Sequence, residues 1–338
     1  MRIVHLVVTD AFAGVERHVT TLAAHQFDHG HRVTVLGCDA EQFRAAVAGR
    51  PVAHHGAASL AAAARALTGT ERPDVLHVHM TAAEIVAALS PRHVGVPLVA
   101  TRHFAQHRGS SRPAKLIGGL AARRIAAQIA VSRHVAEHIE GASVVVPAGV
   151  APQPLPDPAS RDRIVLVAQR LEAEKATDVA LHAFARSGLR GDGWRLAVAG
   201  AGALEGPLRA LAADLGIGEA TDFLGHRHDV DALMRDSGLL LAPCPAEGLG
   251  ITVLEAMSHG LPVVAAAAGG HLETAGRAPA AALFPVGDAA AAARQLGRLA
   301  ADPRARAAYG EQLWRVQREG FTPQSQAAAV ERVYRSIL

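Results

Sequence analysis

Two glutamates and two glycines surround the expected start of a helix in the second half of the chain. They lie in the segment PAEGLGITVLEAM, where Glu247 precedes the helix and Glu255 follows about one turn inside it. Gly248 and Gly250 would let backbone amides approach a ligand closely, and the helix beginning near Ile251 would point its positive end at a diphosphate or at sugar hydroxyls. The alternative is a solvated helix start with ordinary glutamates, which the surrounding pattern disfavours.

Two cations follow an expected buried strand, RIVLVAQ, in the same half of the chain. Arg170 and Lys175 lie five residues apart, and two cations at that spacing can close on a diphosphate from two sides. Lysine otherwise occurs only at position 115, which suggests that a compact ammonium is required at position 175. A solvated loop lysine is the alternative, and we favour the functional interpretation.

A glycine-rich turn, AGAGALEG at residues 199–206, invites a different interpretation. Gly200 and Gly202 could form the phosphate turn of an NAD(P)-dependent oxidoreductase. Gly206, however, falls one position late for that fingerprint, and no acidic residue closes the following strand to hold a ribose. We therefore favour a strand-to-helix turn that needs small residues.

Histidines and paired aspartates raise the question of a metal. His77 and His79 share one face of an expected strand, but no third ligand is evident, and buried hydrogen-bonded histidines are commoner. Asp229 and Asp231 have D-x-D spacing, yet they open a helix, where aspartate is a normal cap. We expect no metal and no resident cofactor.

Short apolar runs alternate with helix-length segments along most of the chain, which is typical of buried parallel strands covered by crossover helices. The first half contains RIVHLVV, RVTVLG, DVLHVH, PLVAT, QIAVS and SVVVP, and the second contains RIVLVAQ, RLAVAG, TDFLG, GLLLAPC, LPVVAAA and ALFPVG. Helices are expected at residues 177–186 and 204–215, and the chain becomes helical beyond Asp288, with Pro303 and Pro323 at helix starts. The pattern predicts an α/β protein with two doubly wound domains.

A proline-rich stretch at residues 147–158 interrupts this rhythm and is typical of an interdomain linker. A length of 338 residues also favours two domains. We predict domains at residues 1–150 and 151–320, followed by a C-terminal helix at residues 321–338.

Composition limits the class of protein and its cellular location. The chain is 50% hydrophobic and 19% charged, which is typical of a globular protein. A net charge of +3 with only 4% aromatic residues provides no stacking platform for nucleic acid. No signal peptide or spanning segment is recognised, and the distant Cys38 and Cys244 do not suggest a disulfide, so a cytoplasmic location is expected.

Residues 102–124 mix basic residues with an apolar stripe. A helix of this kind can lie on a membrane, although an ordinary basic helix covering the first sheet is the favoured alternative. Peripheral contact with the inner membrane face is therefore a second expectation.

Several segments, in order along nearly the whole chain, resemble glycosyltransferase family 4. The segment from Glu247 to Glu255 resembles the E-x7-E motif of that family, and GGHLE resembles its following GG-x-x-E turn. The other segments are FAGVERHVTTLAAHQFDHGHRVTVL, DVLHVH, VATRH, VPAGV, QRLEAEKATDVALHAF, AGAGALEGPLRALAADLG and DFLGHRHDVDALMRDSGLLLAPCPAEGLG.

The resemblance implies the GT-B architecture, in which two Rossmann-like domains face each other across a cleft and a C-terminal helix returns to the N-terminal domain. It also implies a retaining transfer of a hexosyl unit from a UDP- or GDP-sugar donor to a hydroxyl of a small-molecule, glycan or lipid-linked acceptor. No metal is required for such a transfer. A non-catalytic nucleotide-sugar-binding partner is an alternative, but it would be expected to lose Arg170, Lys175 or Glu247, and all three are present.

By resemblance, Arg170 and Lys175 bind the donor phosphates, Glu247 binds the sugar, and His103 lies on the acceptor side as a further candidate catalytic residue. The remaining implied donor-binding residues are Gly14, His226, Gly248, Leu249, Gly250, Ile251, Thr252, Glu255, which would bind the ribose, and Glu273.

The chain departs from the family pattern at four positions. Ala13 replaces one of two glycines beside Gly14, Ala148 stands in the family's P-N-G-V turn, and Gln169 and Ala176 replace glycines beside the two cations. Glu16, in the same loop region as Gly14, could be functional or could simply complement the helix dipole. Both cations of the family pattern are present. The four changes affect the backbone geometry of the loops.

Overall fold

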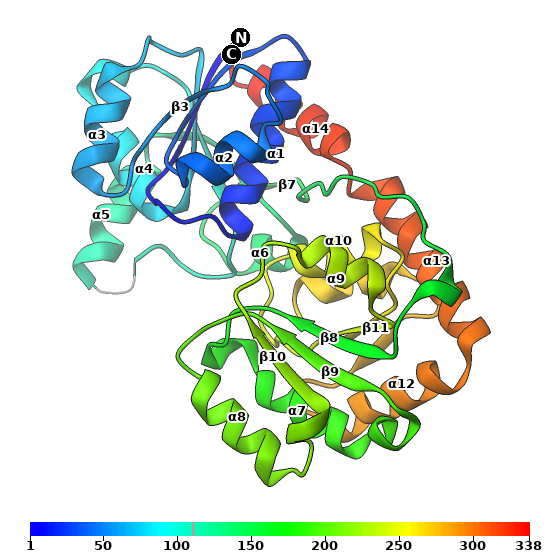
Figure 1. The fold of residues 1–338 in the computed structure, drawn as a ribbon. Coiled ribbons are helices and arrows are strands. Elements are labelled where there is room, and N and C mark those ends of the chain that lie inside the picture. Colours follow the sequence, from blue (N-terminus) through cyan, green and yellow to red (C-terminus); the bar gives the residue numbers. More distant parts are fainter. Residues whose placement is uncertain (110–111) are drawn as a thin grey trace. The chain divides into compact units, whose positions relative to one another are not determined.

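The computed structural model describes residues 1–109 and 112–338 and divides the chain into two compact units (Figure 1). Unit 1 contains Met1–Gly149 and Thr322–Leu338, and unit 2 contains Val150–Phe321. Residues 110 and 111, inside the basic segment 102–124, lie outside the described residues. The last helix thus belongs to unit 1.

Unit 1 is built on a parallel sheet whose strand order is β3-β2-β1-β4-β5-β6-β7. The strands are β1 (Arg2–Val7), β2 (Arg32–Leu36), β3 (Ala53–His55), β4 (Val75–His79), β5 (Leu98–Arg102), β6 (Ile125–Ala130) and β7 (Val144–Val145). The helices are α1 (Gly14–Asp28), α2 (Ala40–Ala46), α3 (Leu60–Gly69), α4 (Met80–Ala88), η1 (Pro91–His93), α5 (Arg112–Ala122), α6 (Arg133–Glu137) and α14 (Pro323–Arg335).

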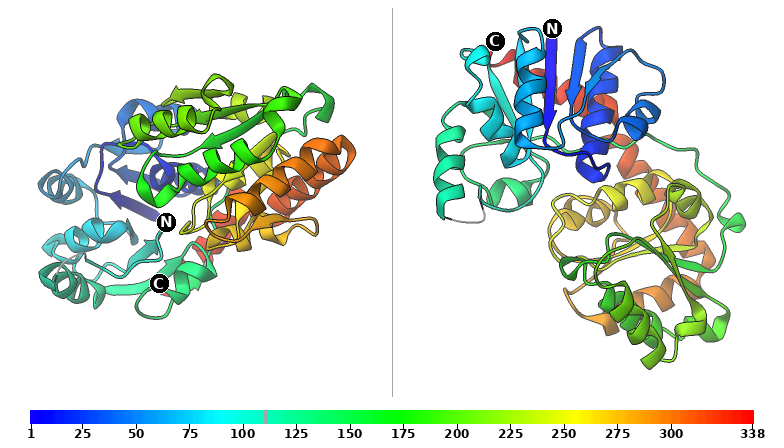
Figure 2. Two further views of the ribbon diagram at one scale, coloured as in Figure 1. Left: turned by 90° about the horizontal axis from the view of Figure 1, so that it is seen from below. Right: turned by 60° about the vertical axis from the view of Figure 1, so that its left-hand side comes forward.

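The alternation of side chains along β1 and β4 assigns each residue to one face of this sheet. Val4, Leu6 and Leu76 pack with α3 and α4, whereas Ile3 and Val75 pack with α1 and α14. Figure 2 shows α14, in red, beside α1, in blue, within unit 1. Helix α14 therefore completes a core that the first 149 residues leave open on this face.

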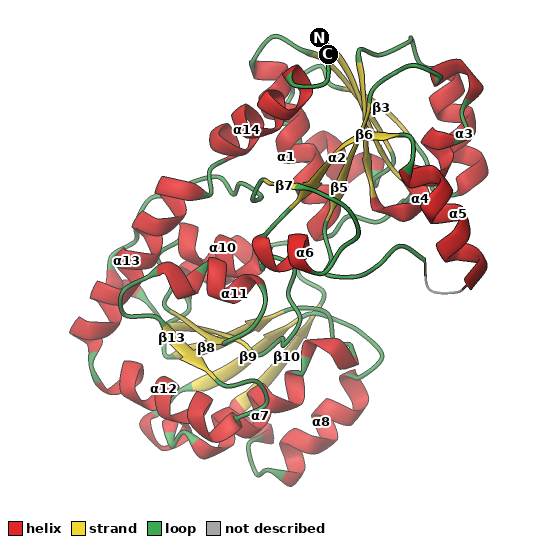
Figure 3. Cartoon of the chain, turned by 180° about the vertical axis from the view of Figure 1, so that it is seen from behind, coloured by secondary structure: helices red, strands yellow, loops and turns green. Residues whose placement is uncertain are grey.

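Unit 2 contains a parallel sheet with strand order β10-β9-β8-β11-β12-β13 (Figure 3). The strands are β8 (Ile164–Ala168), β9 (Arg195–Ala199), β10 (Thr221–Gly225), β11 (Leu239–Ala242), β12 (Val263–Ala266) and β13 (Ala282–Phe284). The helices are η2 (Pro158–Ser160), η3 (Ala173–Lys175), α7 (Thr177–Arg186), η4 (Leu189–Asp192), α8 (Glu205–Asp214), η5 (Gly218–Ala220), α9 (Val230–Asp236), α10 (Ile251–Ser258), α11 (Gly270–Glu273), η6 (Ala275–Arg277), α12 (Ala289–Ala301) and α13 (Pro303–Gly320).

Two doubly wound units with parallel sheets confirm the predicted fold class. The helix predicted at residues 177–186 is α7, that predicted at 204–215 is α8, and Pro303 and Pro323 begin α13 and α14. Strand β3 was not predicted, because three residues with the sequence AHH carry no apolar alternation. It is placed instead by parallel backbone pairing with β2 at the edge of the sheet.

Two further expectations concern cysteines and membranes. Cys38 and Cys244 are both buried free thiols, one in each unit. Among the described helices, none is both long and apolar enough to cross a bilayer.

Candidate functional site

The sheet of unit 2 reverses its winding direction between β8 and β11. From β8 the chain proceeds to β9 and β10 on one side, and it then returns to pair β11 with the other side of β8. Ligands of open parallel sheets bind beyond the carboxyl ends of the strands at such a switch point. The loops that follow β8 and β11 carry the cations and glutamates selected from the sequence.

Lys175, at the end of η3, forms an ion pair with Glu247 in the loop after β11, through Lys175 Nζ and Glu247 Oε1. Both side chains are mostly buried, with 18% of Lys175 and 23% of Glu247 exposed. Burial raises the pKa of Glu247, but the charge of Lys175 and its hydrogen bond outweigh that effect, and the net shift of this pKa is downward. Glu247 is therefore a carboxylate at neutral pH.

Arg170 does not join this pair. Its Nη2 donates to Glu174 Oε1 at 2.8 Å, and 62% of the side chain is exposed. The structure therefore places both predicted cations in the loop after β8, but they contact different carboxylates. Because Arg170 is solvated, it can turn toward a ligand at little cost.

The loop after β11 leads into the N-terminus of α10. Gly250 precedes α10 with φ of 87°, a left-handed conformation that favours glycine. The amide of Gly270, in the GG turn, donates to the carbonyl of Glu247 at 2.8 Å, which ties this turn to the loop. The first turn of α10 presents Ile251 and Thr252, both half-buried.

The remaining donor-binding candidates of unit 2 surround this loop. Gly248 and Leu249 are buried within it, Glu255 is half-buried one turn into α10, and Glu273 is half-buried at the end of α11. His226 is exposed beyond β10, where its ring makes an edge contact with His228 at a centroid distance of 4.7 Å.

His271 was not selected from the sequence, although it lies in the GGHLE segment. It is buried, and its Nδ1 donates to the carbonyl of Ala266 at 3.1 Å. Burial lowers the pKa of His271, with an opposing contribution from Glu247 and a further lowering from Lys175. His271 is thus a neutral imidazole beside the ion pair, and no periodicity or spacing distinguishes it in the sequence.

Two departures from the family pattern have clear structural consequences. Ala176 adopts φ of 50° and ψ of 44°, a left-handed conformation that is strained for alanine. Gln169 donates through Nε2 to the carbonyl of Lys175 at 2.9 Å and to Thr177 Oγ1 at 2.8 Å. The Gln169 side chain thereby holds the backbone on both sides of Ala176.

The glycine-rich turn packs as a strand-to-helix turn. A Cβ atom on Gly200 would lie 1.8 Å from the carbonyl oxygen of Gln169, and one on Gly202 would lie 2.5 Å from that of Leu171. Close packing against the loop after β8 therefore accounts for both glycines without a dinucleotide. In this arrangement the turn supports the loop that carries Arg170 and Lys175.

The paired aspartates make separate contacts. Asp229 occupies the N-cap position of α9, but its carboxylate does not cap the helix and instead accepts two hydrogen bonds from Arg227, at 2.7 and 2.5 Å. The expectation of a capping side chain was therefore wrong, because the neighbouring guanidinium offers a stronger partner. Asp231 is largely exposed and lies 3.3 Å from His259 Nε2.

In unit 1, Gly14 is the first residue of α1 and follows Ala13. Glu16 Oε2 accepts a hydrogen bond from the amide of Ala13 at 2.8 Å. This contact is that of a carboxylate in a capping position and supports the structural interpretation of Glu16.

His103 follows β5 and is only 8% exposed. Its Nε2 lies 3.1 Å from Nδ1 of His79. Burial lowers the pKa of His103 to about 3, so its imidazole is neutral at neutral pH. The structure also brings His5 to His77 and His79, with one nitrogen from each within 4.8 Å of the others, a proximity that was not evident from the sequence.

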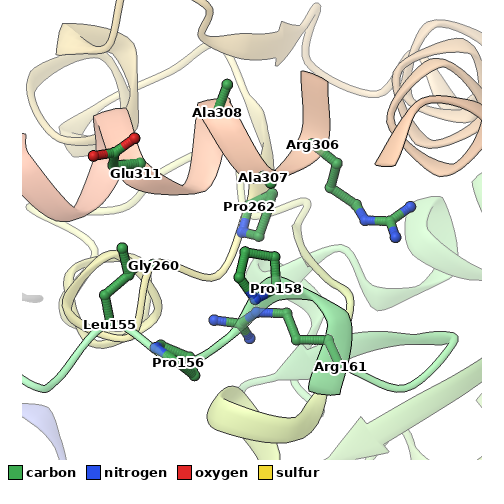
Figure 4. Close-up of a pocket in the computed structure, with 10 residues that line it drawn as sticks. All are labelled: Leu155, Pro156, Pro158, Arg161, Gly260, Pro262, Arg306, Ala307, Ala308 and Glu311. Atoms are coloured by element: carbon green, nitrogen blue, oxygen red, sulfur yellow. The ribbon is translucent and has the colours of Figure 1, made fainter. Parts of the chain in front are cut away.

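A separate cavity in unit 2 lies beside α13 (Figure 4). Arg161 contacts it, but the guanidinium donates to the carbonyls of Met234, Arg235, Ser237 and His259. Arg161 is thus committed to the ends of α9 and α10, and none of the predicted site residues lines this cavity.

Comparisons with protein families match glycosyltransferase models to both halves of the chain. Residues 12–153 match the model of Glycosyltransferase Family 4, and residues 156–313 match that of Glycosyl transferases group 1. A lipopolysaccharide core biosynthesis mannosyltransferase, LpcC of Rhizobium leguminosarum bv. viciae, is 30% identical over 174 residues, which cover 50% of this chain and 49% of that protein. A D-inositol 3-phosphate glycosyltransferase of Salinispora tropica is 38% identical over 159 residues, covering 44% of this chain and 33% of that protein. The chain thus spans about half or less of the length of these relatives.

Solved structures resemble the fold over nearly the whole chain. HepE of Anabaena in complex with UDP-glucose has a TM-score of 0.81 and 20% identity, with 99% of this chain and 100% of that chain covered. Sucrose-phosphate synthase of Thermosynechococcus elongatus has a TM-score of 0.79 and 18% identity, with 99% and 98% covered. At these identities the likeness concerns the fold.

Proposed function

Since the chain belongs to the glycosyltransferases of the GT-B fold, with a family 4 N-terminal half and a group 1 C-terminal half, we propose that it is a retaining hexosyltransferase. The donor is a UDP- or GDP-sugar, and the acceptor is a hydroxyl of a small molecule, a glycan or a lipid-linked sugar. Relatives named as mannosyltransferases and a structural neighbour in complex with UDP-glucose support this donor class.

The observation that carries this proposal is the Lys175–Glu247 pair at the switch point of unit 2, beside the N-terminus of α10. Lys175 and the amides at the start of α10 offer positive charge to a diphosphate, and the Glu247 carboxylate offers hydrogen-bond acceptors to sugar hydroxyls. Arg170, the second cation of this loop, binds the same diphosphate.

In the proposed reaction, the bond between the anomeric carbon and the β-phosphate oxygen breaks while the acceptor oxygen bonds to the same face of that carbon. The acceptor proton passes to an oxygen of the departing diphosphate, so the products are the glycoside and the nucleoside diphosphate. Lys175, Arg170 and the amides of α10 stabilise the negative charge that develops on the leaving group. Glu255 binds the ribose, Glu273 steadies the pocket, and no metal takes part.

The remaining candidates have positioning or binding roles. Gly248, Leu249, Gly250, Ile251 and Thr252 form the loop and helix start that receive the diphosphate. His226 and Gly14 contribute further donor contacts, and His103 contacts the acceptor hydroxyl.

Replacing Lys175 tests the proposal. Lys175→Ala should reduce kcat/KM for sugar transfer at least tenfold, because each charge-assisted contact contributes about 1.5–3 kcal/mol. The assay combines UDP- and GDP-hexoses with acceptor pools, and mass spectrometry detects products while NMR of the new anomeric proton reports retention. Arg298→Ala, on the exposed side of α12, is the matched control and should retain full activity. Unchanged kinetics in Lys175→Ala would contradict the assignment of Lys175 to the donor diphosphate.

We also propose that the protein works in the cytoplasm and that unit 1 contacts the inner membrane face through α5. Leu116, Ile117 and Leu120 of this helix are 68%, 47% and 54% exposed, and Lys115 beside them is exposed too. An apolar stripe flanked by positive charge is suited to an anionic lipid surface.

A further inference from the structure

A cluster of five buried histidines occupies one face of the sheet in unit 1. His5, His18, His77, His79 and His103 make up this histidine cluster, and their exposed fractions are 0%, 4%, 0%, 0% and 8%. Three of them lie on the same face of the sheet as apolar residues that pack with α1 and α14: His5 follows Ile3 by two positions in β1, and His77 and His79 follow Val75 by two and four positions in β4. The cluster thus begins in the core and ends at His103, beyond the carboxyl end of β5.

A continuous series of hydrogen bonds runs from α1 to His103. Gln26 Oε1 lies 2.7 Å from His5 Nε2, His5 Nδ1 lies 3.2 Å from His79 Nε2, and His79 Nδ1 lies 3.1 Å from His103 Nε2. Gln26 Nε2 donates to the hydroxyl of Tyr334 at 3.2 Å, which leaves its Oε1 to face His5.

Proton counting assigns the tautomer of each ring in this series. A neutral imidazole has one N–H donor and one lone-pair acceptor. Burial lowers the pKa of His5 to about 4 and that of His103 to about 3, and burial followed by the neighbouring histidines lowers that of His79 well below its usual value. Because Gln26 Oε1 can only accept, His5 carries its proton on Nε2, and the same logic places the protons of His79 and His103 on Nε2.

The series therefore ends with the lone pair on Nδ1 of His103. Among the described residues this nitrogen has no hydrogen-bond partner. It is also not one of the polar atoms that are both unpaired and fully buried. It is the nitrogen of His103 that a ligand can reach. His77 forms a separate branch, in which Nδ1 pairs with the Tyr334 hydroxyl at 2.6 Å and Nε2 pairs with Thr101 Oγ1 at 2.7 Å.

A metal ion is the competing explanation for such a cluster, since nitrogens of His18, His79 and His103 lie within 4.8 Å of one another. Metal binding requires three free lone pairs that converge. The lone pair of His79 Nδ1 faces the N–H of His103. The lone pair of the His18 ring receives a hydrogen bond from Gln326 Nε2. The Gln326 amide cannot be reversed, because its Oε1 accepts a hydrogen bond from the amide of Gly149. The hydrogen-bond partners thus favour protons over a metal at these positions.

We propose that Gln26, His5 and His79 are positioning residues that hold the proton of His103 on Nε2, so that its Nδ1 accepts a hydrogen bond from the acceptor hydroxyl. This inference rests on the proposed function, in which His103 contacts the acceptor. The series orients the hydroxyl for attack, and no proton is gained or lost by the histidines, because the acceptor proton leaves with the diphosphate. A single amide on α1 thereby selects the state of a ring three hydrogen bonds away.

Nitrogen-15 NMR of the imidazole rings tests the tautomers directly. In the 338-residue chain at neutral pH, His5, His79 and His103 should all be protonated on Nε2 and not on Nδ1. A His103 that is protonated on Nδ1, or a cluster whose tautomers change when Zn²⁺ is added and whose Tm then rises, would overturn the inference. This readout does not need activity, so failure of the positioning series and failure of the proposed function are distinguishable.

Variants of Gln26 test the consequence for transfer. Gln26→Leu removes the acceptor, so His103 should show mixed tautomers and kcat should fall about two- to tenfold, the value of one hydrogen bond, with an unchanged KM for the donor. Gln26→Glu keeps an oxygen facing His5 and should restore both the Nε2 tautomer and kcat. Val330→Ala, in the same core but without a hydrogen-bonding side chain, is the matched control that should lose stability alone. A Gln26→Leu protein with the wild-type tautomer and kcat would contradict the proposal, as would a Gln26→Glu protein that behaves like Gln26→Leu.

Discussion

Lys175 and Glu247 form an ion pair in the structure, and this ion pair affects how a diphosphate can bind. A phosphate oxygen must compete with the Glu247 carboxylate for the ammonium of Lys175. The two residues should therefore respond differently to substitution, although they form one ion pair.

Glu247→Ala should abolish most transfer while leaving the binding of free nucleoside diphosphate equal or tighter. Removal of the carboxylate frees Lys175 for the phosphates, whereas the sugar loses its acceptor, and transfer should fall at least tenfold. Calorimetry with UDP and GDP measures binding, and initial rates measure transfer. An equal loss of diphosphate affinity and of rate would place Glu247 with the phosphates and not with the sugar.

Asp229 and Asp231 lead to a second prediction at this scale. The Asp229 carboxylate is held by Arg227, and Asp231 lies by His259, so the two do not present a shared face to a divalent ion. Transfer should persist in excess EDTA, because cations and helix amides neutralise the diphosphate. Loss of activity with EDTA that is restored by Mg²⁺ or Mn²⁺ would reverse this interpretation.

Helix α5 carries its exposed apolar side chains at positions 116, 117 and 120, a spacing that places them on one side of a helix. Such a stripe in water exposes apolar area that an anionic bilayer would cover.

Leu116→Asp and Leu120→Asp should each weaken binding to vesicles that contain anionic lipid by about tenfold or more, because a buried leucine contributes about 1.5–3 kcal/mol. Co-sedimentation measures the binding, and transfer to a soluble acceptor should not change. Leu60→Asp in α3, where Leu60 is 52% exposed, serves as the control and should bind as the wild type does. Equal binding by all variants would exclude α5 as the contact.

At the scale of the whole molecule, the histidine cluster makes unit 1 sensitive to acid. Burial lowers the pKa values of His5, His18, His77, His79 and His103 in the folded state below the ordinary value of 6.5. The unfolded chain therefore binds protons that the folded unit does not, and stability is fully present above about pH 6.5 and is lost as the pH falls toward the folded-state values.

Each of these histidines should lower the free energy of unfolding by about 1.4 kcal/mol per pH unit once the unfolded state is protonated. Urea unfolding at pH 7.5 and 5 measures this effect. Both tryptophans, Trp194 and Trp314, lie in unit 2, so their fluorescence reports that unit, whereas far-ultraviolet circular dichroism reports both. Acid should move the dichroism transition to lower urea concentration more than the fluorescence transition, and equal shifts would argue against the cluster as the cause.

Much of the fold follows from local patterns that need no tertiary information. Buried parallel strands are mostly apolar, so most of them could be located from the sequence. Prolines mark the starts of α13 and α14 because they cost nothing in a first turn. Strand β3 could not be predicted, because backbone pairing at the edge of the sheet holds it, and backbone hydrogen bonds do not restrict residue type.

The candidate site divides in the same way. Glycines, cations and glutamates at strand ends could be selected from the sequence, because the chemistry of phosphate and sugar binding restricts residue types. The sequence could not predict that Lys175 contacts Glu247 while Arg170 contacts Glu174, because side-chain pairing depends on how two loops leave the sheet. His271 was missed because its role comes from burial beside that pair.

The sequence by itself determined which residues lie on each face of β1 and β4, since alternation along a strand is a local property, and it therefore placed His77 and His79 on one side. Only the tertiary structure decided that His5, Gln26 and Tyr334 meet them there. Gln26 and Tyr334 are 308 positions apart, and α14 brings them into contact because the core of unit 1 lacks that helix until the end of the chain. A hydrogen-bond series through a core needs donors and acceptors from several elements at fixed distances, and only packing sets those distances.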